Sequence, residues 1–186
     1  MNKRVLVAAL TVAGFLLVAV VLFFLLQEPI KEQLYPQKYG QLVERYAQQN
    51  ELEPTLVYAV IYTESRFRPD AESNVGARGL MQLTEETFDW VKYRLDEPKE
   101  VTFDAMYDPE TNIRYGSYLL GYLNKELGNQ KNTLCAYHAG MNIVKKWLAD
   151  KEYSLNGTDL DKIPYKDTAH YVDKVENAIS IYSERK

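Results

Sequence analysis

The sequence predicts a mainly α-helical domain with a small irregular or hairpin segment, preceded by one N-terminal transmembrane helix. Residues 5–26 form an uncharged, apolar run, and beyond them apolar residues recur at spacings of three and four, which is typical of helices. No alternation of polar and apolar residues is long enough to require a sheet. Residues 66–80 are rich in Pro, Asp, Asn and Gly, so we expect a loop or small hairpin there.

The N-terminal segment predicts the location of the protein. Lys3 and Arg4 precede about twenty apolar residues, enough to cross ~30 Å of hydrocarbon, and no small-residue cleavage site follows. We therefore favour an uncleaved anchor over a cleaved signal peptide, with the basic end in the cytoplasm. The predicted parts are a cytoplasmic tail (1–4), a single-pass signal anchor in the cell membrane (5–26), a tether (27–38) and an extracytoplasmic domain (39–186).

Composition excludes several classes of function. Apart from Lys3 and Arg4, 20 basic residues stand against 26 acidic ones, so no nucleic acid is expected as a partner. Cys135 is the only cysteine and lies in an apolar stretch, which predicts a buried, inert thiol. Neither of the two histidines has a partner at metal-ligand spacing, and we predict no metal and no cofactor.

Helix starts and stops divide the domain into elements. Pro54 suits the first turn of a helix. Asp108-Pro109-Glu110 combines a cap, a proline and an early acid, and Gly128 stops the helix that they begin. Asn132 is expected to cap a short helix that ends at Gly140. The expected helices cover residues 37–49, 54–65, a segment from Thr84, 108–127, 132–140, 142–149 and 168–183.

Glu64 is the candidate catalytic residue. The apolar stripe of its helix (Leu56, Val57, Val60, Ile61) continues at this glutamate. Burial disfavours a charged carboxylate, and the negative end of the helix dipole acts in the same direction, so its pKa should be raised. A carboxylic acid that stays protonated near neutral pH is what a general acid for glycosidic-bond cleavage requires. Alternatively, the helix frays and Glu64 turns to solvent or pairs with a nearby arginine.

The loop after Glu64 offers a second group of candidates. Gly76 and Gly79 permit unusual backbone angles and a close approach by a ligand. Gln82, next to Met81, has the donor and acceptor needed to bind sugar hydroxyl and acetamido groups. The alternative is a tight turn that leads into the helix at Thr84.

Two further segments place polar groups beside small or apolar residues. Tyr137 and His138 lie between Ala136 and the Ala139-Gly140 turn, and His138 is as well explained by a structural role as by a ligand contact. Tyr171 lies on an apolar stripe of the last helix, so its hydroxyl needs a buried partner, and Glu64 would serve. An ordinary core tyrosine is the alternative.

The sequence shows no clear second catalytic acid. Glycosidases of the retaining and inverting types usually use two carboxylates. Asp70 and Glu72 follow Glu64, but neither lies on an apolar stripe. A lone buried acid indicates a mechanism in which the substrate supplies the nucleophile.

Taken in order, these motifs resemble the soluble-lytic-transglycosylase family of peptidoglycan enzymes. The resemblance covers about residues 39–183. The motifs are Glu64-Ser65, Gly79-Leu80-Met81-Gln82, Asp108 to Ile113 with Gly116, Ala136-Tyr137-His138-Ala139-Gly140, and Ile163 to Thr168 before Tyr171-Val172.

The resemblance implies a lysozyme-like fold and cleavage of the β-1,4 bond between N-acetylmuramic acid and N-acetylglucosamine in peptidoglycan glycan strands. Glu64 would act as acid and then as base, closing a 1,6-anhydro ring without consuming water. Ser65, Met81, Gln82, Tyr137, His138 and Tyr171 would bind substrate or orient the site. The family commonly has asparagine where this chain has His138, which leaves the role of that residue open.

Two other functions stay open from the sequence. One is a hydrolytic muramidase on the same scaffold, and the other is a non-catalytic glycan-binding scaffold in an envelope machine whose partners are unknown. The membrane, reached through the N-terminal helix, is the second expected partner besides the glycan.

Overall fold

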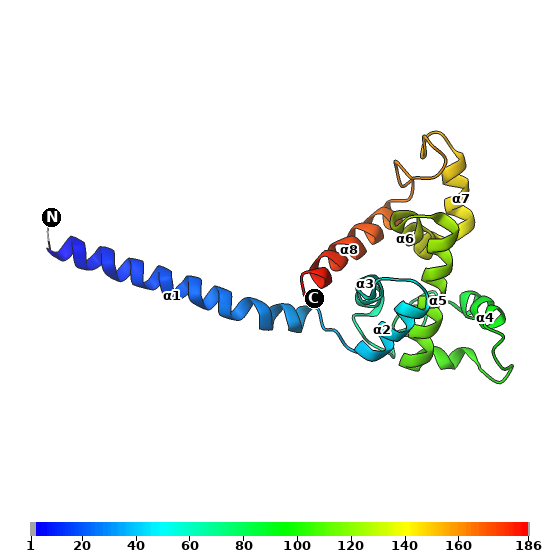
Figure 1. Cartoon of the computed structure of the whole chain (residues 1–186), viewed down its shortest axis with the longest axis horizontal. Coiled ribbons are helices and arrows are strands. Elements are labelled where there is room, and N and C mark those ends of the chain that lie inside the picture. The colour runs from blue at the N-terminus through cyan, green and yellow to red at the C-terminus, as the bar shows by residue number, and fades with distance from the viewer. Residues whose placement is uncertain (1–2, 186) are drawn as a thin grey trace. The chain divides into compact units, whose positions relative to one another are not determined.

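The computed structural model describes residues 3–185, without the side chains of residues 5, 6, 8–10, 24–28 and 30. The chain divides into two compact units, Met1–Gln37 and Lys38–Lys186. Figure 1 shows the first as one long helix and the second as a group of shorter helices. The elements are α1 (Lys3–Leu34), α2 (Gly40–Gln49), α3 (Pro54–Ser65), α4 (Glu85–Arg94), the 3-10 helix η1 (Phe103–Tyr107), α5 (Pro109–Leu127), α6 (Gln130–Ala139), α7 (Met141–Ala149) and α8 (Lys166–Ser183).

In the first unit, residues 27–34 of the expected tether (27–38) are helical in α1, which contains Pro29. The transmembrane helix expected over residues 5–26 is not supported: over the described residues, no helix is both long enough and apolar enough to cross a membrane. Residues 1 and 2 of the expected cytoplasmic tail lie outside the described residues.

The second unit is mainly helical, as predicted. In the described residues, the segment after α3 contains no strand but two isolated antiparallel bridges, Glu72 with Arg78 and Arg78 with Leu83. These bridges close a small irregular turn where we expected a loop or hairpin. The prediction for the start of α4 is also confirmed, because the Thr84 hydroxyl accepts a hydrogen bond from the Thr87 amide.

Helix α3 is the central helix of this unit. It packs against α8 and α2, which lie near it in Figure 1. The sequence predicted one apolar stripe, but Thr55, Tyr58 and Ala59 on its other sides are buried too. A helix that is apolar nearly all round is a core helix. Its last turn is therefore held from several directions, which positions Glu64.

Helix α5 forms the second framework element, and its ends follow the predicted signals. The Asp108 carboxylate accepts a hydrogen bond from the Thr111 amide, and Gly128 ends the helix at φ 75°. Helix α6 differs, because Asn129 rather than Asn132 caps it. Asn132 is buried instead, and its side-chain amide donates to the backbone oxygens of Leu127 and Thr158. The Asn132 side chain thus connects α6 to the distant loop that contains Thr158 instead of capping the helix.

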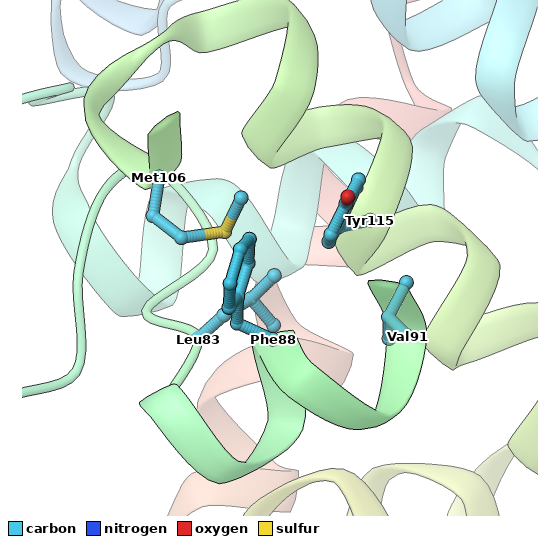
Figure 2. Packing of buried hydrophobic residues seen from close by; sticks show 5 residues of the cluster. All are labelled: Leu83, Phe88, Val91, Met106 and Tyr115. Atoms are coloured by element: carbon cyan, nitrogen blue, oxygen red, sulfur yellow. The ribbon is translucent and has the colours of Figure 1, made fainter. Parts of the chain in front are cut away.

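A compact apolar cluster connects α4, η1 and α5 to the loop that follows α3. Figure 2 shows its members, which are Leu83, Phe88, Val91, Met106 and Tyr115. The rings of Phe88 and Tyr115 stack with their centroids 5.6 Å apart. Because Leu83 belongs to this cluster, the residues directly before it, Met81 and Gln82, are fixed relative to α5.

Candidate active site

Glu64 lies in the last turn of α3 and is partly exposed, although protein surrounds most of its carboxyl group. Burial raises its pKa from 4.5 to about 7, and the contact with Tyr171 lowers it by less. The helix ends directly after it because Arg66 and Phe67 adopt left-handed backbone angles, with φ of 52° and 60°. Two adjacent residues of this kind are strained, as is common beside functional groups. The predicted protonated acid is therefore consistent with the structure.

Tyr171 and Tyr137 lie beside Glu64. Burial is the largest cause that raises the pKa of each phenol, and the negative charge of Glu64 raises both further. The Tyr137 hydroxyl donates to the Met81 backbone oxygen at 2.7 Å. The buried Tyr171 hydroxyl has no hydrogen-bond partner at normal geometry. It still lowers the pKa of Glu64, so the two groups are close enough to interact.

Met81 and Gln82 are held by the backbone and by two amide side chains. The Met81 amide donates to the side-chain oxygen of Asn112 at 2.8 Å. Gln82 has a positive φ of 49°, and its side-chain nitrogen donates to the backbone oxygens of Ala71 and Gly79. In this structure the Gln82 amide therefore supports the loop. Within the described residues, its side-chain oxygen accepts no hydrogen bond from the protein.

Asn112 is the structural residue of the site that sequence reasoning missed. It is fully buried in α5, and its nitrogen donates to the backbone oxygens of Arg78 and Met106 while its oxygen accepts from Met81. One side chain thus connects three backbone segments. An asparagine four residues after a helix cap was the available signal, but Arg78 and Met81 are remote in sequence and could not be identified from it as partners.

Ser65 and His138 lie in different surroundings. Ser65 is buried, and its hydroxyl donates to the Ile61 backbone oxygen in its own helix, so it shapes the end of α3. His138 is exposed, and its Nδ1 lies 3.1 Å from the Thr168 hydroxyl. The His138 ring also lies against the Tyr171 ring, with centroids 4.7 Å apart. Although the residue is exposed overall, partial burial of its imidazole lowers the pKa of His138, and the charge of Asp167 raises it by less.

An aromatic groove begins at Tyr137. We call it the Trp90 groove; its volume is about 450 Å³, and Trp90, Tyr122, Tyr137, Ala139 and Ile143 are among its lining residues. The centroids of the Trp90 and Tyr122 rings lie 4.8 Å apart. Ala139 also lines a second hollow of about 440 Å³ that includes His138. Flat aromatic walls beside a candidate acid suit the apolar faces of sugar rings.

Replacing Tyr171 with phenylalanine tests its effect on Glu64. The Tyr171 hydroxyl stabilises the ionised carboxylate and so lowers the pKa of Glu64. Without it the pKa should rise, and the alkaline limb of kcat/KM, expected near pH 7 in the unmodified protein, should move to higher pH. A matched control is Tyr182→Phe, a change in another buried tyrosine of α8 that stacks on Tyr58. An alkaline limb that is unchanged in Tyr171→Phe, or that moves equally in both variants, would contradict this role.

Comparison with known proteins shows the family of the chain. Residues 41–157, more than half of the chain, match the family described as the Transglycosylase SLT domain. The chain belongs to this family. Its SLT domain therefore has the mainly helical, lysozyme-like fold that the sequence motifs implied.

Relatives of the SLT domain include soluble and membrane-bound proteins. The chain is 31% identical to soluble lytic murein transglycosylase of Escherichia coli K12 over 146 residues. This match covers 77% of this chain and 23% of that protein. The chain is 28% identical over 169 residues to membrane-bound lytic murein transglycosylase C of Serratia proteamaculans, covering 80% and 47%. An inactive glutamate-to-glutamine mutant of lytic transglycosylase Slt from Pseudomonas aeruginosa has a TM-score of 0.71 at 28% identity, covering 81% and 25%. The chain spans less than half the length of these three relatives.

Proposed function

We propose that this SLT domain is a peptidoglycan lytic transglycosylase that cleaves the β-1,4 bond between N-acetylmuramic acid and N-acetylglucosamine. The observation that carries the proposal is Glu64, a carboxyl group whose pKa is raised to about 7 at the end of a buried helix beside Tyr137 and Tyr171. The names of the relatives support it, since they are lytic murein transglycosylases. The inactive glutamate-to-glutamine mutant of one relative also fits an essential glutamate.

In the proposed mechanism Glu64 acts twice. Protonated Glu64 first gives its proton to the glycosidic oxygen, and the bond to the muramoyl C1 breaks. The acetamido oxygen of the substrate stabilises the cation that develops there. Ionised Glu64 then takes the proton of the muramoyl 6-hydroxyl, whose oxygen attacks C1 and closes the 1,6-anhydro ring. Proton and electron pairs balance within the two sugars, and Glu64 returns to its protonated form.

A single acid is consistent with the surroundings of Glu64. Both nearby candidates, Asp70 and Glu72, are exposed, and the Glu72 carboxylate accepts a hydrogen bond from the Tyr107 hydroxyl at 2.7 Å. Among the described residues, no carboxylate contributes to the shift in the pKa of Glu64. This supports a nucleophile that comes from the substrate rather than from a second carboxylate.

The chemistry of the new glycan ends tests the proposal. Purified protein should convert peptidoglycan into fragments with 1,6-anhydro muramoyl ends, each lighter by one water than the hydrolysis product. In water enriched in heavy oxygen these ends should contain no label, as mass spectrometry can measure. Labelled reducing ends would instead identify a muramidase, and glycan binding without any new ends would identify a scaffold.

We also propose that the domain acts outside the cytoplasm, because peptidoglycan lies there. Membrane attachment, which the uncharged residues 5–26 led us to expect, is a separate prediction from the sequence. Fractionation of cells tests both: protease added to spheroplasts should digest the domain, and alkaline washing of membranes distinguishes an integral from a peripheral or soluble protein. Protection from protease in spheroplasts would contradict the location.

A further inference from the structure

A cationic hollow adjoins the Trp90 groove. It has a volume of about 380 Å³ and is lined by the end of α2, by Arg94 at the end of α4, and by Tyr118, Tyr122 and Lys125 of α5. Tyr122 is a wall of both the hollow and the Trp90 groove. A ligand that occupies the groove and continues past Tyr122 therefore reaches this hollow, which we call the Arg94 hollow.

The guanidinium of Arg94 is exposed and lies over aromatic rings. It lies over the rings of Trp90 and Tyr122, at 5.6 Å and 5.2 Å from their centroids. Its Nε donates to the Tyr118 hydroxyl at 3.2 Å. In the part of the chain that the structure describes, Nε is the only nitrogen of this guanidinium that donates to a protein group. The two terminal nitrogens are thus open, and an arginine with such a free fork suits a carboxylate.

The charges of the hollow are positive overall. Arg94 and Lys125 line it together with one acid, Glu51. Glu126 is also close enough to act on Arg94, but its carboxylate lies 3.3 Å from the Lys145 amine, which compensates it. This differs from the rest of the chain, in which acidic residues outnumber basic ones. A local excess of positive charge in an acidic protein indicates an anionic ligand.

We propose that the Arg94 hollow binds a carboxylate of the peptide attached to the muramoyl residue, while the Trp90 groove binds the sugars. This inference rests on the proposed function, since it concerns the same substrate. Peptidoglycan sugars of the repeating unit are uncharged, and the anionic groups of that unit are the carboxylates of its stem peptides. The SLT domain would therefore prefer peptide-bearing glycan to bare glycan, and Arg94 would be a specificity-determining residue.

The test compares three forms of the same glycan strands: with stem peptides, with the peptide carboxyls amidated, and with the peptides removed by an amidase. For Arg94→Ala, KM on the peptide-bearing strands should rise about fivefold with kcat unchanged, as expected for loss of a solvent-exposed ion pair. KM on the amidated and bare strands should not change. Arg94→Lys should recover only part of the loss because it keeps the charge without the fork.

Arg45→Ala is the control. It also removes an exposed arginine from beside a tyrosine ring, here Tyr46 at 6.0 Å, and it breaks an ion pair with Glu110, but Arg45 does not line the hollow. An equal effect of Arg94→Ala on all three strands would overturn the inference and leave Arg94 with a packing role, and so would no effect on any strand.

Binding measurements separate this inference from the proposed catalysis. In the Glu64→Gln protein, calorimetry with the three forms of strand reports affinity without turnover. Tighter binding of peptide-bearing strands, lost on the further change Arg94→Ala, supports the hollow even if the wild type proves to cleave nothing. Equal affinity for all three forms, or no binding of any, overturns it.

Discussion

Glu64→Gln should lower kcat for peptidoglycan cleavage by at least about a hundredfold, while the domain stays folded. General acid–base catalysis contributes roughly 10²–10⁴-fold, and in the proposed mechanism the same group both gives and takes a proton. Glutamine preserves the shape of the side chain but can do neither. The measurement is the rate at which new 1,6-anhydro ends appear, with circular dichroism to confirm the fold.

An exposed acid in the loop after α3, Asp70, provides the control. Asp70→Asn makes the same acid-to-amide change close in sequence to Glu64, but at an exposed position. It should retain most of the activity. A Glu64→Gln protein that clears cell wall as fast as wild type would end the assignment of Glu64 as the acid and base.

The same variant should change how stability depends on pH. The pKa of Glu64 is about 7 in the folded protein and 4.5 as an ordinary carboxyl, so the folded state binds the proton more tightly. As the pH rises from about 4.5 to about 7, the free energy of unfolding of the wild type should therefore fall, by roughly 3 kcal/mol from this group. Glu64→Gln lacks this dependence, so its stability relative to wild type should increase over that interval. Urea unfolding of both proteins at pH 5 and pH 8 measures this change. The same difference in free energy of unfolding between Glu64→Gln and wild type at both pH values would contradict it.

Gly79→Ala should destabilise the domain by about 3–5 kcal/mol, a large effect for a single methyl group. Gly79 has a φ of 77°, and a Cβ there would lie 2.0 Å from the Met106 backbone oxygen and 2.2 Å from the side-chain nitrogen of Asn112. Neither atom can move freely, because Asn112 donates to that same Met106 oxygen. Urea unfolding measures the loss, and kcat should fall too because Met81 and Gln82 would be displaced.

Gly76→Ala separates the two causes of this loss. Gly76 has the same φ of 77°, but a Cβ built there meets no heavy atom within 4 Å. It should therefore lose only the cost of the left-handed backbone, about 1–2 kcal/mol. Equal losses of stability in the two variants would show that Met106 and Asn112 can move to accommodate a Cβ. Gly79 would then be required for its backbone angle alone.

Sequence reasoning located the elements well where the signals are local. Asp108 with Pro109, Thr84 and Gly128 mark helix ends, and the structure places the ends there. The cap of α6 was wrong because Asn129 and Asn132 are equivalent in local propensity. The choice depends on Leu127, Thr158 and Leu160, which surround Asn132 only in the folded chain.

The candidate site shows the same division. Glu64 and Tyr171 could be predicted because each extends an apolar helical stripe, which needs only the period of a helix. Asn112 and Trp90 could not. Asn112 matters through contacts with Arg78 and Met81, which lie more than thirty residues earlier, and Trp90 through a groove formed with α5 and α7. The sequence does not show which distant segments meet.

The sequence by itself determined the helical class, the family and the identity of the candidate acid, because these follow from periodicity, caps and the order of short motifs. It also predicted that the pKa of this acid is raised, but only the tertiary structure decided how far. The pKa of Glu64 depends on how completely other helices cover α3 and on where Tyr171 of α8 lies. Likewise, the Arg94 hollow exists only because the ends of α2 and α4 meet one face of α5. Desolvation and charge proximity are properties of the assembled fold, and no local pattern specifies them.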